Sequence, residues 1–73
     1  MKNYQFTIIV QQDEDGNFLA ICPALQGCYA EGITKNEALE NIQDAIKLHI
    51  EDRIEKGEPI LEEIYSNKIS VAA

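Results

Sequence analysis

The stretch CPALQGCYAEGIT, residues 22–34, places two cysteines, a proline and two glycines near the middle of a chain of 73 residues. Pro23 has no backbone N–H and therefore ends any strand that reaches it. Gly27 gives the backbone the freedom that a second turn needs. The stretch therefore predicts that one strand ends before Pro23 and that another short strand occupies residues 28–32.

A long helix is predicted to follow this stretch. Thr34 stands three residues before Glu37, the capping-box spacing in which the hydroxyl and the carboxylate each satisfy an otherwise unpaired N–H. The helix should begin at Lys35 and end where Gly57 is followed by Pro59, giving about 22 residues and about 33 Å at 1.5 Å per residue. Apolar residues recur along it at intervals of three and four, which predicts one buried face. The residues of that face are Ala38, Leu39, Ile42, Ala45, Ile46, Ile50 and Ile54.

The residues before the stretch predict a β-hairpin. From residue 4 to residue 12, aromatic and β-branched residues recur at every second position, the pattern of a strand with one buried face. The short polar side chains and the glycine of residues 13–17 predict a tight reversal, and the apolar run 18–22 supplies the returning strand. At the other end of the chain, residues 68–72 predict a fourth strand.

The predicted order of elements is β-β-β-α-β in an α+β fold. It comprises a three-stranded antiparallel meander, one long helix on one face, and a C-terminal strand that can lie parallel to the first. The length favours a single domain over residues 1–73. Because a domain this small buries only about 60% of its unfolded surface, we expect a homodimer or a larger homo-oligomer to add buried surface.

Composition limits the class of partner. Residues 1–10 lack the charged and apolar regions of a signal peptide, and polar residues interrupt every apolar run, so we expect a cytoplasmic protein without a membrane partner. The net charge of −7, from 13 acidic and 6 basic residues, disfavours direct binding of nucleic acid, which depends on Lys and Arg. A basic protein partner suits this charge, although acidity can also serve solubility alone.

The two cysteines are interpreted as core residues. Cys22 and Cys28 do not have the two-residue separation of zinc knuckles or of thioredoxin-like redox pairs. Together with His49, the single histidine, they fall one ligand short of a tetrahedral metal site. We therefore expect small buried side chains, with redox pairing as the minority alternative. His49 lies on or beside the apolar face of the helix and is interpreted as a packed rather than a catalytic residue.

Asp13, Glu14 and Asp15 form an acidic cluster beside Gly16. Carboxylates can bind a divalent cation, but the further ligands of an EF-hand are missing, and a solvated hairpin loop is the preferred interpretation. The sequence contains no nucleophile elbow, no phosphate-binding glycine loop and no zinc-protease motif. We therefore expect no catalytic residue, no cofactor and no metal site.

Four short motifs stand in order along the chain. They are an Asp-Gly turn at Asp15 and Gly16, a Pro-x-Leu-x-Gly-Cys turn at Pro23, Leu25, Gly27 and Cys28, a Gly-x-Thr helix start at Gly32 and Thr34, and the helical run EALENI from Glu37. With this series the chain closely resembles the HicB antitoxin family over roughly residues 4–56. Several ordered motifs make the resemblance more specific than any one of them.

The resemblance implies a partial ribonuclease-H-like fold and the role of a type II antitoxin. Such an antitoxin binds a small basic HicA toxin, an mRNA-cleaving ribonuclease, and covers its active site. The side chains that we expect to contact the toxin are Asp13, Glu14, Asp15, Tyr29 and Glu31. Many family members continue into a DNA-binding module, whereas this chain stops at Ala73, so we expect no direct contact with an operator.

Two other functions are weighed beside this one. An orphan member of the family could be an oligomeric scaffold or bind a small ligand. A reduced ribonuclease-H-like nuclease is disfavoured, because two-metal chemistry needs convergent carboxylates. One of these usually stands at the centre of the first strand, and residues 4–12 contain none.

Overall fold

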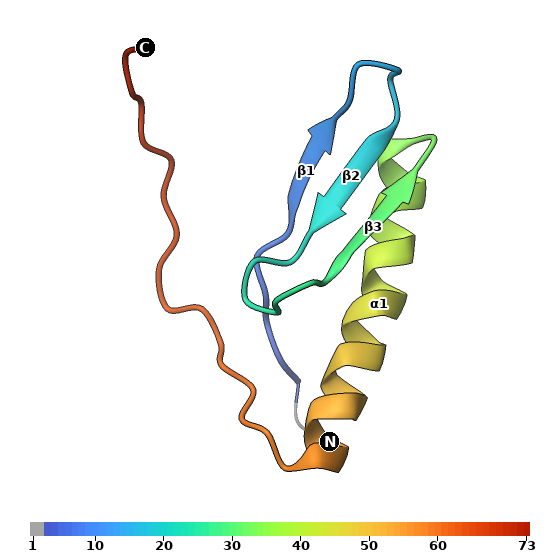
Figure 1. The fold of residues 1–73 in the computed structure, drawn as a ribbon, viewed down its shortest axis with the longest axis vertical. Helices are drawn as coiled ribbons and strands as arrows, with labels where there is room; N and C mark the ends of the chain where they lie inside the picture. The colour runs from blue at the N-terminus through green and yellow to red at the C-terminus, as the bar shows by residue number, and fades with distance from the viewer. Residues whose placement is uncertain (1–2) are drawn as a thin grey trace.

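The fold is a small antiparallel sheet with one long helix on one of its faces. The computed structural model describes residues 3–73. Its elements are β1 (Ile9–Gln12), β2 (Phe18–Ile21), β3 (Tyr29–Gly32) and α1 (Lys35–Lys56). The strands lie in the order β1-β2-β3, each antiparallel to the next (Figure 1). The predicted α+β fold, with its three-stranded meander and long helix, is therefore confirmed.

The stretch at residues 22–34 forms the turn between β2 and β3. Cys22 donates its N–H to the carbonyl of Cys28 at 3.0 Å, Leu25 donates to Cys22 at 3.1 Å, and Cys28 donates to Leu25 at 3.0 Å. Gly27 has a φ of +77°, which a residue without a Cβ adopts at little cost. The turn points three side chains inward, so the stretch is an architectural element of the core.

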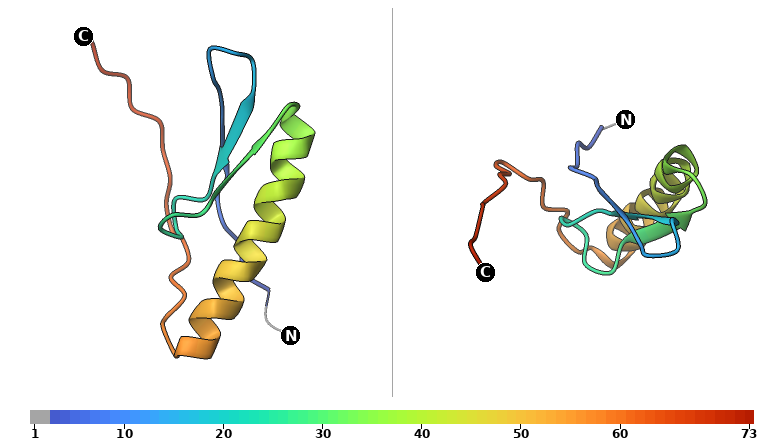
Figure 2. Two further views of the ribbon diagram at one scale, coloured as in Figure 1. Left: turned by 45° about the vertical axis from the view of Figure 1, so that its right-hand side comes forward. Right: turned by 90° about the horizontal axis from the view of Figure 1, so that it is seen from above.

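The core is small and is centred on this turn. Its fully buried side chains belong to Ala20, Cys22, Leu25, Cys28, Ala38 and Ile42. The predicted apolar face of α1 is covered only along its first half, and Ile54 is 61% exposed. Strands of four residues are about 13 Å long, whereas the 22-residue helix is about 33 Å long. The second half of the helix therefore extends beyond the sheet (Figure 2).

Both ends of α1 are capped as the sequence predicts. The hydroxyl of Thr34 accepts from the N–H of Glu37 at 3.1 Å, and the Glu37 carboxylate accepts from the N–H of Ile33 at 3.3 Å. The carboxylate thus bonds one residue earlier than the expected capping box. At the other end Gly57 has a φ of +70° and donates to Ile54 at 3.1 Å.

Replacing Thr34 by alanine should lower the free energy of unfolding by about 1 kcal/mol, because the first turn of α1 loses a hydrogen-bond acceptor. Urea denaturation followed by far-UV circular dichroism measures the loss. Glu40→Ala is the matched control, since Glu40 is exposed on the same helix and has no capping role. An equal loss in both variants would show that Thr34 does not cap the helix.

The first strand is shorter than predicted. The alternating pattern begins at Tyr4, but β1 begins at Ile9. In the observed register Ile9 lies opposite Ile21, so Thr7 would lie opposite Pro23. Proline has no N–H to donate to a ladder, and the pairing stops before it. The residues that precede β1 therefore leave the sheet.

The predicted C-terminal strand at residues 68–72 does not form, and this prediction is wrong for the chain as the structure describes it. Within residues 3–73 the sheet has three strands. Residues 57–73 turn back from the end of α1 and run beside β1 at a distance (Figure 1). A hollow of about 680 Å³ separates residues 66–68 from residues 7–10. A strand needs a neighbour for its N–H and C=O groups, and this segment has none within reach.

Candidate partner-binding face

One face of the sheet is left uncovered by the helix. Successive residues of a strand point to opposite faces, and Ala20, at the centre of β2, is buried on the helix side. The opposite side, here called the open face, is therefore formed by the alternate residues of each strand. These residues are Ile9, Gln11, Leu19, Ile21, Tyr29 and Glu31. Figure 2 shows α1 on the other side of the sheet.

The strand register arranges the open face in two rows. Ile9, Ile21 and Tyr29 lie side by side in one row, across the three strands. Ile9 is 43% exposed and Tyr29 is 62% exposed, while Ile21 is half-buried. Antiparallel sheets usually present polar side chains on the face that meets water. This row of the open face is apolar instead.

The second row carries the acidic end of the open face. It consists of Gln11, Leu19 and Glu31, and it is the row nearer the hairpin loop between β1 and β2. That loop holds the acidic residues 13–15, all of which are exposed. The structure thus places Tyr29 and Glu31 together on one face, with the acidic loop at the end of the same sheet.

Asp13 shapes the hairpin loop. One of its carboxylate oxygens, Oδ1, accepts from the N–H groups of Asp15 and Asn17, both at 2.9 Å. Its own N–H donates to the carbonyl of Asn17 at 2.8 Å, and Gly16 reverses the chain with a φ of +87°. Because Asp13 is engaged within the turn, Glu14 and Asp15 are the loop carboxylates best placed to meet a partner.

Four residues of the open face were not among the predicted site residues. They are Gln11 and the three apolar residues Ile9, Leu19 and Ile21. The available signal was the unbroken apolar run of residues 18–22, since a strand with only one covered face should alternate. The sequence predicts that this run is partly buried on both faces of the sheet. Only the strand register shows that Leu19 and Ile21 lie on the open face.

Both cysteines lie in the core, as predicted. Cys22 is 1% and Cys28 is 2% exposed, and both thiols are free. Burial raises the pKa of both thiols above the usual value, and the nearby Glu63 carboxylate adds to the increase at Cys22. Among residues 3–73, no three His, Cys, Asp or Glu side chains gather as metal ligands would. His49 is half-buried on α1.

The stability of the fold should decline in alkaline solution because of these thiols. The folded state holds the thiol protons more tightly than the unfolded state, whose cysteines have a pKa of about 8.5. The stabilisation is therefore complete below about pH 8.5 and is lost as the pH rises toward the folded-state pKa. Urea denaturation at about pH 7 and about pH 9.5 measures this, and the Cys22→Ala/Cys28→Ala variant should show a smaller decline. Equal declines in both proteins would contradict the assignment.

A second surface feature is an apolar hollow beside the exposed half of α1. It has a volume of about 440 Å³. Tyr4 and Phe6 line it from the N-terminal segment, and Ile46, Ile50 and Ile54 line it from the helix. It is the feature that a small-ligand-binding function would use.

No helix within residues 3–73 has the length and apolar character needed to cross a membrane.

Comparison with known proteins supplies the family. Residues 6–70 match the profile described as the HicB-like antitoxin of bacterial toxin-antitoxin systems. The chain belongs to the HicB-like antitoxin family. It is 40% identical over 60 residues to the UPF0150 protein ssr1765 of Synechocystis, covering 82% of this chain and 76% of the relative. It is 45% identical over 56 residues to the UPF0150 protein Ta0767 of Thermoplasma acidophilum, covering 77% and 81%.

The solved structures give no significant match to this chain. The partial ribonuclease-H-like label therefore stays a prediction. For the HicB-like antitoxin family, membership implies a toxin partner in general and suggests a role without catalysis.

Proposed function

We propose that this HicB-like antitoxin neutralises a small basic HicA-type ribonuclease by covering its active site with the open face and the acidic hairpin loop. The observation that carries the proposal is the open face, where Ile9 and Tyr29 are exposed on the side of the sheet opposite the helix. Apolar and aromatic side chains at the centre of a patch are typical of the residues that dominate binding energy.

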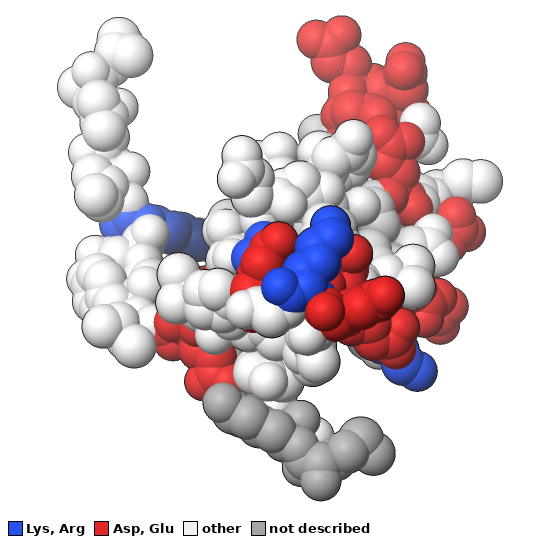
Figure 3. Space-filling view, turned by 60° about the horizontal axis from the view of Figure 1, so that its bottom comes forward, with Lys and Arg blue, Asp and Glu red and all other residues white. Residues whose placement is uncertain are grey.

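Charge supports a basic partner. The chain carries a net charge of −7. Figure 3 shows acidic side chains at several places on one face, together with basic side chains near its centre. A ribonuclease surface that attracts RNA phosphates is basic, so the two potentials are complementary and should speed association. The same charge makes direct nucleic-acid binding unfavourable. We also propose that the protein acts in the cytoplasm and does not itself contact operator DNA.

The size of the open face limits what it can do alone. Three strands spaced about 4.8 Å apart and about 13 Å long cover roughly 190 Å² in projection. A standard protein interface buries about 800 Å² on each partner. The open face can therefore form only the apolar centre of the toxin contact. Glu14, Asp15 and Glu31 would then contribute to a charged rim.

A homodimer is part of the proposal. Within residues 3–73, six buried side chains form a modest core, and domains of this size usually need a further source of stability. A dimer formed through surfaces other than the open face would leave that face available to a toxin.

Co-expression tests the toxin function. A small basic HicA-type toxin should arrest growth when expressed alone, and co-expression of the 73-residue chain should restore growth and yield a complex that co-purifies. The toxin alone is the control for arrest. If growth stays arrested and no complex forms, the antitoxin proposal is wrong for this pair. Restoration without a complex would show that the chain does not act by covering the toxin.

A further inference from the structure

The two edges of the sheet differ. On β3, the side-chain amide of Asn41 donates to the carbonyl of Glu31 at 2.8 Å, which occupies an outward-facing backbone group. On β1, Asp13 donates to Asn17 across the hairpin at 2.8 Å, and bonded pairs alternate along an antiparallel ladder. Counting back from Asp13, the backbone groups of Val10 and Gln12 face away from β2. The edge of β1 is therefore the edge whose backbone groups are available to pair with another strand.

The side of β1 that faces the core is also poorly covered. α1 packs on β3 and β2, so it crosses the sheet on the far side from β1 (Figure 1). Ile8 and Val10 contact the core but remain half-buried. A strand added at this edge could cover them with apolar side chains of its own.

The chain carries a segment with the pattern of such a strand. In residues 65–71 three of the four odd positions are apolar or aromatic, namely Tyr65, Ile69 and Val71, and the fourth is Asn67. The positions between them hold serine and lysine. This period-two alternation is typical of a half-buried strand. Tyr65 is 77%, Ile69 is 83% and Val71 is 81% exposed. The C-terminal arm, defined as residues 58–73, thus presents an apolar stripe that nothing covers within the described chain.

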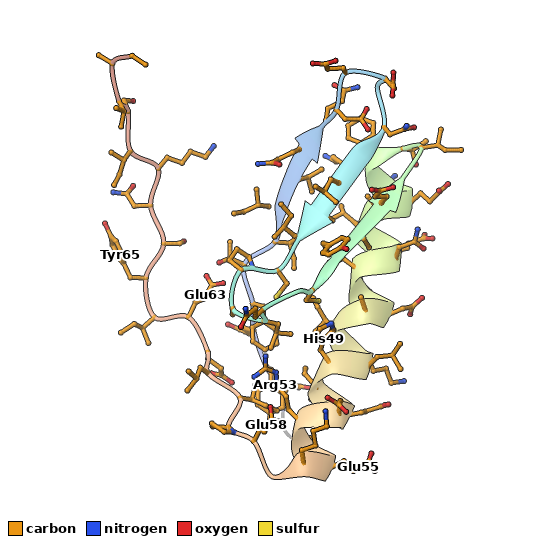
Figure 4. The ribbon with its side chains drawn as sticks, viewed as in Figure 1. His49, Arg53, Glu55, Glu58, Glu63 and Tyr65 are labelled. Carbon is orange, nitrogen blue, oxygen red and sulfur yellow. The ribbon has the colours of Figure 1, made fainter. Side chains whose placement is uncertain are left out.

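The position of the arm on its own chain is unfavourable. Glu63 points toward the sheet, whereas Tyr65 points away from it (Figure 4). One carboxylate oxygen of Glu63, Oε1, is buried without a hydrogen-bond partner among residues 3–73, which is a costly arrangement. The hollow between the arm and residues 7–10 keeps the apolar stripe away from the chain's own β1.

The arm is long enough to reach a second molecule. Its 16 residues span up to about 53 Å when extended at about 3.3 Å per residue, compared with a longest extent of 40 Å for the whole chain. Gly57 ends the helix with a left-handed residue, and Pro59 cannot continue it. Two copies related by a two-fold axis would each supply one arm and one edge, so that neither is left unpaired.

We propose that residues 65–72 of each copy pair as an added strand with the free edge of β1 in a second copy, placing Ile69 and Val71 over Ile8 and Val10. This strand exchange rests on the homodimer proposed above and makes it specific, but it does not involve the toxin. The open face stays exposed in such a dimer.

Light scattering coupled to size exclusion tests the exchange with the full chain. The protein, whose mass is 8.2 kDa, should elute at twice that mass. Ile69→Lys/Val71→Lys should raise the dimer dissociation constant by about 100-fold or more, because each substitution brings a charge into an apolar contact. Ser66→Lys/Ser70→Lys is the matched control: it adds the same charge to the other side of the arm and should remain dimeric. Far-UV circular dichroism should show the same helix content in all three proteins.

A sample that mixes isotope-labelled and unlabelled chains identifies the surfaces in contact. Intermolecular nuclear Overhauser effects between the methyl groups of Ile69 or Val71 and those of Ile8 or Val10 support the exchange. A monomer, a dimer that survives the Ile69→Lys/Val71→Lys change, or effects confined to one chain would each overturn it. Neither measurement uses the toxin, so failure of the exchange and failure of the antitoxin proposal are distinguishable.

Discussion

Replacing Gly32 by alanine should lower the free energy of unfolding by about 3 kcal/mol, near the upper end of typical overpacking penalties. A Cβ at this position would lie 2.4 Å from the backbone nitrogen of Ala38 and 2.9 Å from the carbonyl carbon of Glu37. Both neighbours are backbone atoms of α1, so the helix would have to move away from β3. A domain of this size has roughly 4 to 11 kcal/mol in total. Chemical denaturation followed by circular dichroism measures the loss.

Gly27→Ala is the control for the Gly32 prediction. Gly27 has a φ of +77°, but a Cβ there meets nothing within 4 Å. Its cost should come from the left-handed backbone alone and reach about 1 kcal/mol. If both variants lose the same free energy, close contact between β3 and α1 is not what selects glycine at position 32.

Replacing Tyr29 by arginine should weaken toxin binding by about 100-fold, within the range measured for central aromatic residues of interfaces. The change removes an aromatic side chain from the open face and adds a positive charge that repels a basic partner. Calorimetry with the toxin, or with an inactive variant of it, gives the dissociation constant. Circular dichroism should show that the fold is kept, because Tyr29 is 62% exposed.

Leu48→Arg is the matched control for Tyr29→Arg. Leu48 is 67% exposed and lies on α1, so the same charge is added to an equally exposed apolar position outside the open face. Its effect on toxin binding should be less than threefold, since surface charges away from an interface are screened. If Leu48→Arg weakens binding as much as Tyr29→Arg, the toxin does not dock on the open face.

The caps and turns of this fold were predictable from sequence because their signals are local. The hydroxyl of Thr34 and the αL residue Gly57 bound α1 at the residues expected. The hairpin at Asp13 and Gly16 and the turn around Gly27 also lie where the sequence places them. Each depends on hydrogen bonds between residues at most six positions apart, so the pattern alone contains the relevant geometry.

The limits of the strands were less predictable, because pairing depends on the neighbouring strand. The residues from Tyr4 to Ile8 have the alternation of a strand, but the register would place Thr7 opposite Pro23. The residues at 68–72 also have a strand pattern, but they pair with no strand in the part of the chain that the structure describes. Propensity describes what a segment can do, while pairing requires an available edge at the right distance.

The candidate site was predicted in part for the same reason. Tyr29 and Glu31 alternate on one strand, so the sequence could place them on a common face. Their apolar neighbours Leu19 and Ile21 join that face only through the register of β2 with β3. The role of these residues in toxin binding remains a proposal.

The sequence by itself determined the order of β1, β2, β3 and α1, the bounds of the helix and the family, because caps, turns and motifs are encoded within a few residues of one another. Only the tertiary structure decided which sheet face is open, which edge is free and where the C-terminal arm lies. The open face follows from the packing of α1 over β2 and β3 on the opposite side of the sheet. Packing between segments distant in sequence depends on strand register and on the position of the helix. The local sequence pattern specifies neither of them.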